Sequence, residues 1–172
     1  MATATGISLS EYLATDYKPD REYLDGEVVE RNVGQGPHSY TQTALGAWLF
    51  GQQKRWNMLT LTEQRVQVSG THYRIPDLCV VRKDDFANII QRPPLLCVEI
   101  LSPEDRWNRV QDSIADYLRF GVPEIWVIDP EEAKAWICTP EGGQRLVADG
   151  VLRWNGLSIE LREILPDEQT VQ

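Results

Sequence analysis

Two acidic residues stand where a carboxylate is unusual. Glu99 interrupts residues 95–101 (LLCVEIL), a run that is otherwise apolar. An ionised carboxylate within a buried run is costly unless it is paired or used in chemistry. Asp77 follows Pro76, which cannot donate to a strand ladder, so Asp77 is expected at a bulge, an edge or a strand start. The structural alternative for Glu99 is a side chain that reaches a sheet edge or pairs with an arginine.

The spacing of the two acids favours a shared site. Asp77 lies 22 residues before Glu99, a separation that suits neighbouring strands joined by a connection. Two carboxylates that converge from neighbouring strands supply the hard oxygen ligands that Mg²⁺ or Mn²⁺ prefers. Such a metal polarises a phosphate and lowers the pKa of a water nucleophile. These residues therefore predict a metal site at Asp77 and Glu99.

The first half of the chain carries periodic patterns that predict the elements around this site. Residues 8–14 are expected to form a helix capped by Ser8 or Ser10, and residues 22–33 a hairpin that turns at Asp25-Gly26. Apolar residues at helical spacing predict a helix over 37–54. Strand patterns follow over 58–68 and over 72–82, the second broken at Pro76.

A strand, a helix and a strand are expected over residues 95–130. The apolar run 95–101 is typical of a strand buried on both faces. Ser102 to Asp105 predicts a helix start with a capping box, and Gly121 a helix stop. Residues 123–130 (PEIWVIDP) predict a second strand, parallel to the first. The helix carries an apolar stripe of Trp107, Val110, Ile114, Tyr117 and Leu118. Short antiparallel strands are expected over 133–165, and the pattern alone predicts an α/β fold.

Composition limits the class of protein. The 172 residues suit one domain spanning 1–172, and a net charge of −9 argues against passive binding to nucleic acid. A nuclease is not excluded, because a divalent metal and local arginines attract a phosphate. No membrane span or secretory signal is predicted. The three cysteines, Cys79, Cys97 and Cys138, have no CxxC spacing and are expected to be buried in a reducing cytoplasm.

Several segments, in this order, resemble the Uma-two family of proposed restriction endonucleases, within the PD-(D/E)XK nuclease superfamily. They are EYLDGE (22–27), His38, YRIPDLCVV (73–81), VEILSPEDR (98–106) and DYLRFGVPEIWVIDP (116–130). The resemblance implies an α/β (α+β) restriction-endonuclease-like core with a mixed central sheet flanked by helices. It also implies hydrolysis of DNA phosphodiesters assisted by Mg²⁺ (or Mn²⁺). Because paired strand cuts need two active sites, a homodimer is expected.

The resemblance also implies roles for particular residues. Asp77 would bind the metal, and Glu99 would bind it and orient the attacking water. Glu22 resembles the acidic residue that the superfamily often adds from its N-terminal segment, and His38 would lie near the mouth of the site. The structural alternatives are a solvated carboxylate beside a turn for Glu22 and a capping or solvent-facing side chain for His38.

The lysine of the superfamily is missing. Its usual position, two residues after the glutamate, holds Leu101, and the position to which this family moves it holds Ser113. Arg109 and Arg106 share a helical face with Ser113 and could supply the positive charge. An arginine stabilises phosphate charge but is a poor general base, because it stays protonated.

Two functions therefore compete. The first is a metal-dependent DNA endonuclease, and the second is a catalytically degenerate nuclease-fold module for binding or assembly. A hydrolase for another substrate would suit the acidic surface, but no motif in the sequence supports it. Arg74 could contact a phosphate, with a surface charge on a strand as the alternative. Core packing rather than base stacking is expected of Trp48, Trp56, Trp107 and Trp126.

Overall fold

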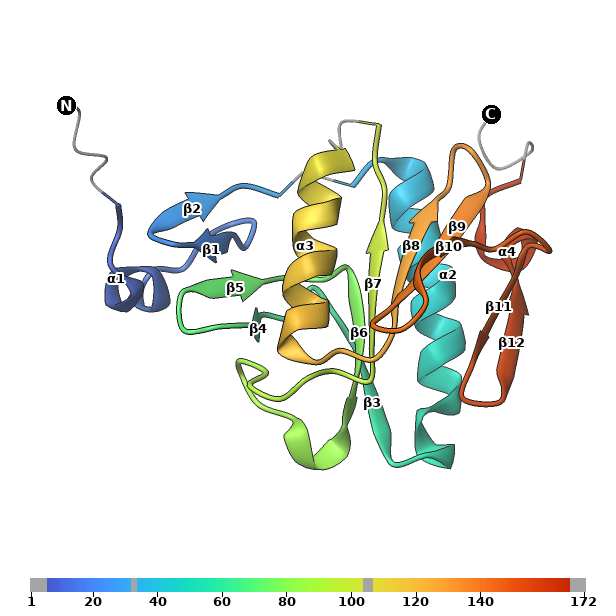
Figure 1. The fold of residues 1–172 in the computed structure, drawn as a ribbon, viewed down its shortest axis with the longest axis horizontal. Helices are drawn as coiled ribbons and strands as arrows, with labels where there is room; N and C mark the ends of the chain where they lie inside the picture. Colours follow the sequence, from blue (N-terminus) through green and yellow to red (C-terminus); the bar gives the residue numbers. More distant parts are fainter. Residues whose placement is uncertain (1–5, 32–33, 104–106, 168–172) are drawn as a thin grey trace.

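The computed structural model describes residues 6–31, 34–103 and 107–167. Its centre is a six-stranded mixed sheet in the order β10-β9-β8-β7-β6-β3 (Figure 1). The pairing of β7 with β8 is parallel, and the other four pairings are antiparallel. The strands are β3 (Met58–Thr62), β6 (Leu78–Arg82), β7 (Leu96–Ile100), β8 (Ile125–Asp129), β9 (Lys134–Thr139) and β10 (Gly143–Leu146).

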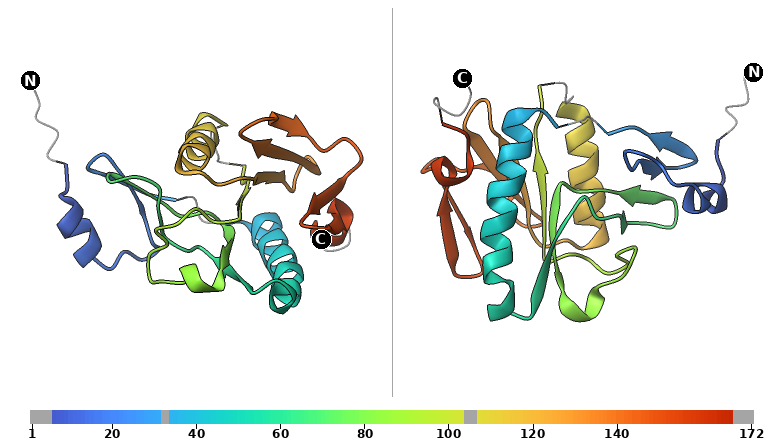
Figure 2. Two further views of the ribbon diagram at one scale, coloured as in Figure 1. Left: turned by 60° about the horizontal axis from the view of Figure 1, so that its bottom comes forward. Right: turned by 180° about the vertical axis from the view of Figure 1, so that it is seen from behind.

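Helices cover both faces of this sheet, as the resemblance implied. α2 (Gly36–Gln52) lies on one face and α3 (Trp107–Phe120) on the other (Figures 1 and 2). Alternation along β7 explains the two layers, since successive side chains of a strand point to opposite faces. Leu96, Val98 and Ile100 pack in the core that contains Leu45 of α2. Cys97 packs instead with side chains of α3.

Two smaller sheets flank the central one. A four-stranded sheet in the order β2-β1-β5-β4 lies beside α3, and α1 packs on it through a cluster of tyrosines (Figure 1). A hairpin of β11 and β12 ends the described chain together with α4. These elements are α1 (Leu9–Ala14), β1 (Glu22–Leu24), β2 (Glu27–Val29), β4 (Val66–Gln67), β5 (His72–Arg74), β11 (Val151–Trp154), β12 (Leu157–Glu160) and α4 (Leu161–Ile164), with 3₁₀ turns η1 (Gln53–Arg55) and η2 (Lys83–Asp85).

Several local predictions are confirmed. Ser8 caps α1 by accepting a hydrogen bond from the backbone N–H of Glu11. The hairpin of β1 and β2 turns at Asp25 and Gly26, which both have positive φ. Gly121, with φ of 105°, ends α3. All three cysteines are buried and free, and no helix among the described residues is long and apolar enough to cross a membrane.

The prediction of one strand over residues 58–68 is wrong. The segment forms β3 and β4, which belong to different sheets. Glu63 separates them with a φ of 49°, and its backbone N–H donates to the backbone oxygen of Asp77. A left-handed residue cannot continue a pleated strand. The predicted break at Pro76 is present, and it also separates two strands, β5 and β6, that belong to different sheets. Asp77 directly precedes the start of β6.

The connection from β7 through α3 to β8 is the expected parallel unit. The predicted capping box involves residues 104–106, which lie outside the described residues, and the described helix begins at Trp107. Val110, Ile114 and Tyr117 are buried as the stripe predicts. Trp107 is 42% exposed and packs edge-on against Trp136 at a centroid distance of 5.3 Å, so the expectation of core packing fails for this tryptophan.

A substitution at Leu96 tests how much the core around β7 contributes to the stability of the protein. Its side chain is fully buried in the core on the α2 side of the sheet. We expect Leu96→Ala to lower the free energy of unfolding by about 2–5 kcal/mol, because it removes buried methyl groups and leaves a cavity. Chemical denaturation measures the change. Leu146→Ala is the matched control, since Leu146 is 48% exposed; equal effects of the two substitutions would contradict the assignment of the core.

Candidate active site

The register of β6 and β7 brings the two predicted acids together. The antiparallel pairs Leu78↔Val98 and Cys79↔Cys97, continued by one residue, place Asp77 opposite Glu99. Cys79 and Cys97 belong to the core on the α3 side of the sheet. By alternation, Asp77 and Glu99 also project toward α3. The backbone N–H of Ile100 donates to Asp77 Oδ2 at 2.7 Å, which ties the two strand ends together.

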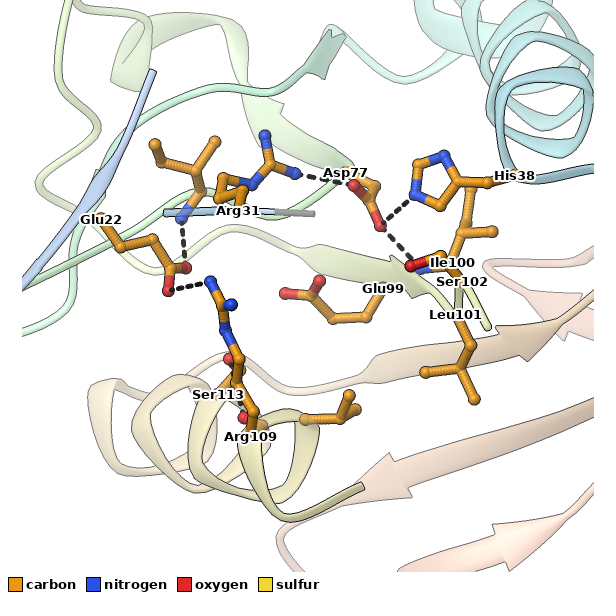
Figure 3. Close-up of a pocket in the computed structure, with 12 residues that line it drawn as sticks. Glu22, Arg31, His38, Asp77, Glu99, Ile100, Leu101, Ser102, Arg109 and Ser113 are labelled. Atoms are coloured by element: carbon orange, nitrogen blue, oxygen red, sulfur yellow. Dashed lines mark hydrogen bonds and ion pairs between the residues drawn. The ribbon is translucent and has the colours of Figure 1, made fainter. Parts of the chain in front are cut away.

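Asp77 is buried and its carboxylate is surrounded by donors. Arg31 Nη2 donates to Oδ1 at 2.7 Å. His38 Nε2, from the first turn of α2, lies 3.2 Å from Oδ2. A buried carboxylate is tolerated when it is paired and hydrogen-bonded in this way. Figure 3 shows Arg31 and His38 approaching Asp77 from different sides.

Glu99 is half-buried and has a different environment. The hydroxyl of Tyr117 in α3 donates to Glu99 Oε1 at 2.6 Å. Burial, followed by the nearby negative charge of Asp77, raises the pKa of Glu99 well above its ordinary range, although the hydrogen bond from Tyr117 opposes the shift. Glu99 therefore does not form the edge contact of the structural alternative. It is a carboxyl group that is costly to ionise until more positive charge arrives.

Glu22 enters the same site from β1 and is buried. Its Oε1 accepts from the backbone N–H of Ile75 at 3.2 Å, and its Oε2 accepts from Arg74 Nη1 at 3.1 Å. The alternative of a solvated carboxylate beside a turn is therefore wrong. Three carboxylates, on β1, just before β6 and on β7, line one pocket.

The α3 side of the site carries Arg109 and Ser113. Arg109 Nη2 donates to the backbone oxygen of Glu30 at 2.6 Å and lies 3.8 Å from Glu22 Oε2. The Ser113 hydroxyl donates to the backbone oxygen of Arg109 at 3.3 Å, one turn back along its own helix. The shared helical face predicted for these two residues is present. Arg106, predicted on that face, lies outside the described residues.

A polar pocket with a cavity of about 50 Å³ joins these groups (Figure 3). Space of this size holds a few waters or one hydrated ion, but not a nucleotide. Figure 3 shows Glu99 reaching between Asp77 and Arg109. The predicted residues that line the pocket are Glu22, His38, Asp77, Glu99, Leu101, Arg109 and Ser113.

Arg74 does not line the pocket. It is 3% exposed, and its guanidinium bridges Glu22 and Asp116, with Nε and Nη2 at 2.8 and 2.7 Å from Asp116 Oδ2. The predicted contact with a phosphate and the alternative of a surface charge both place this side chain at solvent, and neither matches its burial. Arg74 holds Glu22 in position from behind.

Arg31 lines the pocket, and sequence reasoning missed it. The residue belongs to the segment after β2, between the EYLDGE motif (22–27) and His38 but part of neither. Its only sequence signal is a cationic residue in the second half of the predicted hairpin over residues 22–33. That signal is weak, because a charged residue at the end of a strand is usually solvated.

The carboxylate oxygens of Asp77 and Glu99 are suitable ligands for a divalent cation. The pKa of Glu99 is raised by burial and by Asp77, and a cation between the two groups would relieve that repulsion. No group of three or more His, Cys, Asp and Glu side chains able to hold a metal occurs in the described part of the chain. Mg²⁺ commonly takes one or two carboxylates and keeps several waters. Two protein carboxylates are therefore sufficient.

The fold and this pocket define a restriction-endonuclease-like class of protein, with a mixed sheet that presents paired carboxylates at one end. The chain belongs to the Uma2 family, whose model, described as "Putative restriction endonuclease", matches residues 9–171. No curated protein matches the chain.

A solved structure shares the fold. The crystal structure of a "putative nuclease belonging to DUF820" from Anabaena variabilis is 24% identical, with a TM-score of 0.82. The match covers 92% of this chain and 97% of that chain. At this identity the likeness establishes the fold.

A chain of buried charges continues from the pocket to the surface. Asp116 accepts from Arg74 and lies 2.9 Å from His72 Nδ1, while His72 Nε2 lies 3.0 Å from Asp25 Oδ2. With a carboxylate at each ring nitrogen, the imidazolium form satisfies both contacts. Burial lowers the pKa of His72, but the hydrogen bonds to Asp25 and Asp116 outweigh it, so the pKa lies above its ordinary 6.5.

The contacts of His72 with Asp25 and Asp116 predict that the stability of the protein depends on pH. Because the folded-state pKa of His72 is raised, its stabilisation is complete below the unfolded value of 6.5 and is lost as pH rises through the folded value. We expect the melting-temperature difference between wild type and His72→Gln to be largest near pH 6 and to shrink by about pH 8.5. Calorimetry across this range measures it. A constant difference would show that His72 does not titrate as a charged partner.

Proposed function

We propose that this protein is a metal-dependent endonuclease that hydrolyses phosphodiester bonds in DNA with Mg²⁺ or Mn²⁺. The observation that carries the proposal is the placement of Asp77 opposite Glu99 in a polar pocket of an Uma2-family chain. Two carboxylates that lie opposite each other in a polar pocket suit a hard divalent cation. A phosphodiester is a substrate that such a cation activates.

Each acid has a distinct role in this proposal. When bound, the metal would polarise the scissile phosphate and lower the pKa of a water molecule. Asp77 and Glu99 would hold the metal through carboxylate oxygens. Glu99 Oε1 accepts from Tyr117, so its second oxygen is the one that would orient the attacking water and accept its proton. Glu22, fixed by Arg74 and by the N–H of Ile75, would shape the opposite wall.

The missing lysine gives the second candidate function its support. Leu101 carries no charge, and Ser113 uses its hydroxyl within its own helix. Neither side chain can neutralise a phosphate or relay a proton as an ammonium group does. A site that binds a divalent metal without cutting, in a nuclease-fold module for binding or assembly, is therefore the alternative. Arg109 would supply positive charge in either case, but not general-base catalysis.

The proposed setting follows from the chemistry. DNA is the proposed partner, and the local cations and a metal would attract it despite the net charge of −9. A homodimer would supply two sites for paired strand cuts. Three buried free cysteines suit a reducing compartment, so we place the protein in the cytoplasm.

Removal of the paired acids tests the proposed metal site. We expect Asp77→Asn and Glu99→Gln each to weaken Mn²⁺ binding, measured by calorimetry, by about tenfold or more, because each removes one anionic ligand. Cleavage of supercoiled plasmid and of single-stranded DNA with Mg²⁺ or Mn²⁺ should fall by at least about 10²-fold.

Glu141→Gln is the matched control, since Glu141 is exposed on the turn between β9 and β10 and its substitution also removes one negative charge. Unchanged metal affinity in both pocket variants would refute the assigned ligands. Metal binding without cleavage by folded wild-type protein would favour the non-catalytic candidate.

Introducing a lysine at position 113 tests whether the absence of this lysine limits catalysis. Ser113 is buried and lines the pocket from α3. We expect Ser113→Lys to raise the rate of plasmid nicking by about tenfold or more, because an ammonium group there would neutralise developing phosphate charge. Ser113→Ala is the control for loss of the hydroxyl. A Ser113→Lys protein that is folded and no faster than wild type would show that other cations already fill this role.

A further inference from the structure

The pocket contains a cation that the family motifs do not include. Arg31 follows β2, and its side chain is largely buried against Asp77, with Nη2 2.7 Å from Oδ1. A guanidinium has five N–H donors. Among the described residues, Asp77 is the partner of Arg31 in a hydrogen bond or ion pair. Other donors of the same group thus remain for a ligand in the pocket.

Two contacts of Glu30 anchor the backbone that leads into Arg31. The backbone oxygen of Glu30 accepts from Arg109 Nη2 at 2.6 Å, and the Glu30 carboxylate pairs with Arg21 Nη2 at 2.6 Å. These contacts link the end of β2 to α3 and to the segment before β1. A cation on an anchored backbone is better positioned for catalysis than one on a free loop, because less side-chain freedom is lost on binding.

Arg31 is cationic whatever its surroundings, because a guanidinium stays protonated. In this structure it neutralises Asp77. A divalent metal on Asp77 and Glu99 would take over neutralisation of the carboxylate that Arg31 now neutralises. The guanidinium, which lines the pocket, would then have positive charge available for an anionic ligand there.

Arg109 is less suited to that position. Its guanidinium donates to the backbone oxygen of Glu30 at 2.6 Å and lies 3.8 Å from Glu22 Oε2, which is too far for a hydrogen bond. Within the described part of the chain, the Arg109 guanidinium contacts Glu30 and Glu22 and makes no hydrogen bond or ion pair with either proposed metal ligand. Arg109 thus closes the pocket wall, whereas Arg31 touches the metal-binding carboxylate itself.

We propose that Arg31 is the cationic group that contacts the substrate phosphate, in place of the lysine absent at Leu101 and Ser113. This inference rests on the proposed nuclease function and adds a residue to it. Arg31 would neutralise phosphate charge and would not act as a base, because a guanidinium stays protonated. Its planar donors suit two phosphate oxygens at once.

The test compares Arg31→Gln and Arg31→Lys with wild type. We expect Arg31→Gln to cut plasmid about 10²-fold more slowly with Mn²⁺, as loss of one charge-stabilising donor does in other enzymes. Its Mn²⁺ affinity, measured by calorimetry, should be equal or higher, because the competing cation has left Asp77. Arg31→Lys should recover part of the rate. A purely structural role would instead lower metal affinity together with activity.

Arg82→Gln is the matched control. Arg82 ends β6, the strand that follows Asp77, is exposed, and its loss changes the net charge equally. Arg31→Gln protein that cuts as fast as Arg82→Gln protein would overturn the inference. So would an Arg31→Gln variant that binds Mn²⁺ more weakly than wild type, since Arg31 would then serve to hold Asp77.

A binding measurement separates this inference from the proposed function. Fluorescence anisotropy of a labelled 20-nucleotide single strand, with Ca²⁺ replacing Mn²⁺, reports phosphate contact without cleavage. If wild type does not cut, weaker binding by Arg31→Gln than by Arg82→Gln would support Arg31 as a phosphate contact and reject the nuclease function. Equal binding by the two variants would reject the Arg31 contact. If wild type neither cuts nor binds the strand, both proposals fail.

Discussion

The site depends on one constraint, the antiparallel pairing of β6 with β7 that sets two carboxylates opposite each other. Like charges directly opposite on neighbouring strands repel, and burial strengthens the repulsion. The fold offsets this cost with side chains from three other places, Arg31 after β2, His38 on α2 and Tyr117 on α3, and with the N–H of Ile100 on β7 itself. These groups are partners for the two acids, and a divalent cation would complete that set.

A second layer of charge holds the first in place. Glu22, Arg74, Asp116 and His72 form a continuous series of ion pairs from the pocket toward solvent. The series joins β1 and β5 of the smaller sheet to α3, which otherwise packs on the central sheet. A buried pair of this kind stabilises little in net terms, because desolvation offsets the attraction. Its main effect is to fix the orientation of Glu22 and of the α3 face that carries Arg109.

The absent lysine changes how positive charge is distributed, rather than removing it. Ser113 leaves α3 without an ammonium group, but two guanidinium groups reach the pocket, from β2 and from α3. This arrangement separates two tasks that one lysine can combine. An arginine can neutralise a phosphate, whereas proton transfer must fall to a carboxylate or to water. Burial and the charge of Asp77 raise the pKa of Glu99, the carboxylate to which the proposal assigns this proton transfer.

Most of the helices and strands, and the two acids of the pocket, could be predicted from the sequence, with residues 58–68 as an exception. The apolar run around Glu99, the proline before Asp77 and the Asp25-Gly26 turn act locally, and local chemistry is visible in sequence. The contacts between side chains could not be predicted in this way. Arg74 is as charged as Arg31 in the sequence, yet one is buried behind Glu22 and the other lies on Asp77. Strand register and the approach of the β1–β2 hairpin to α3 set that difference, and both come from pairings between residues distant in the chain.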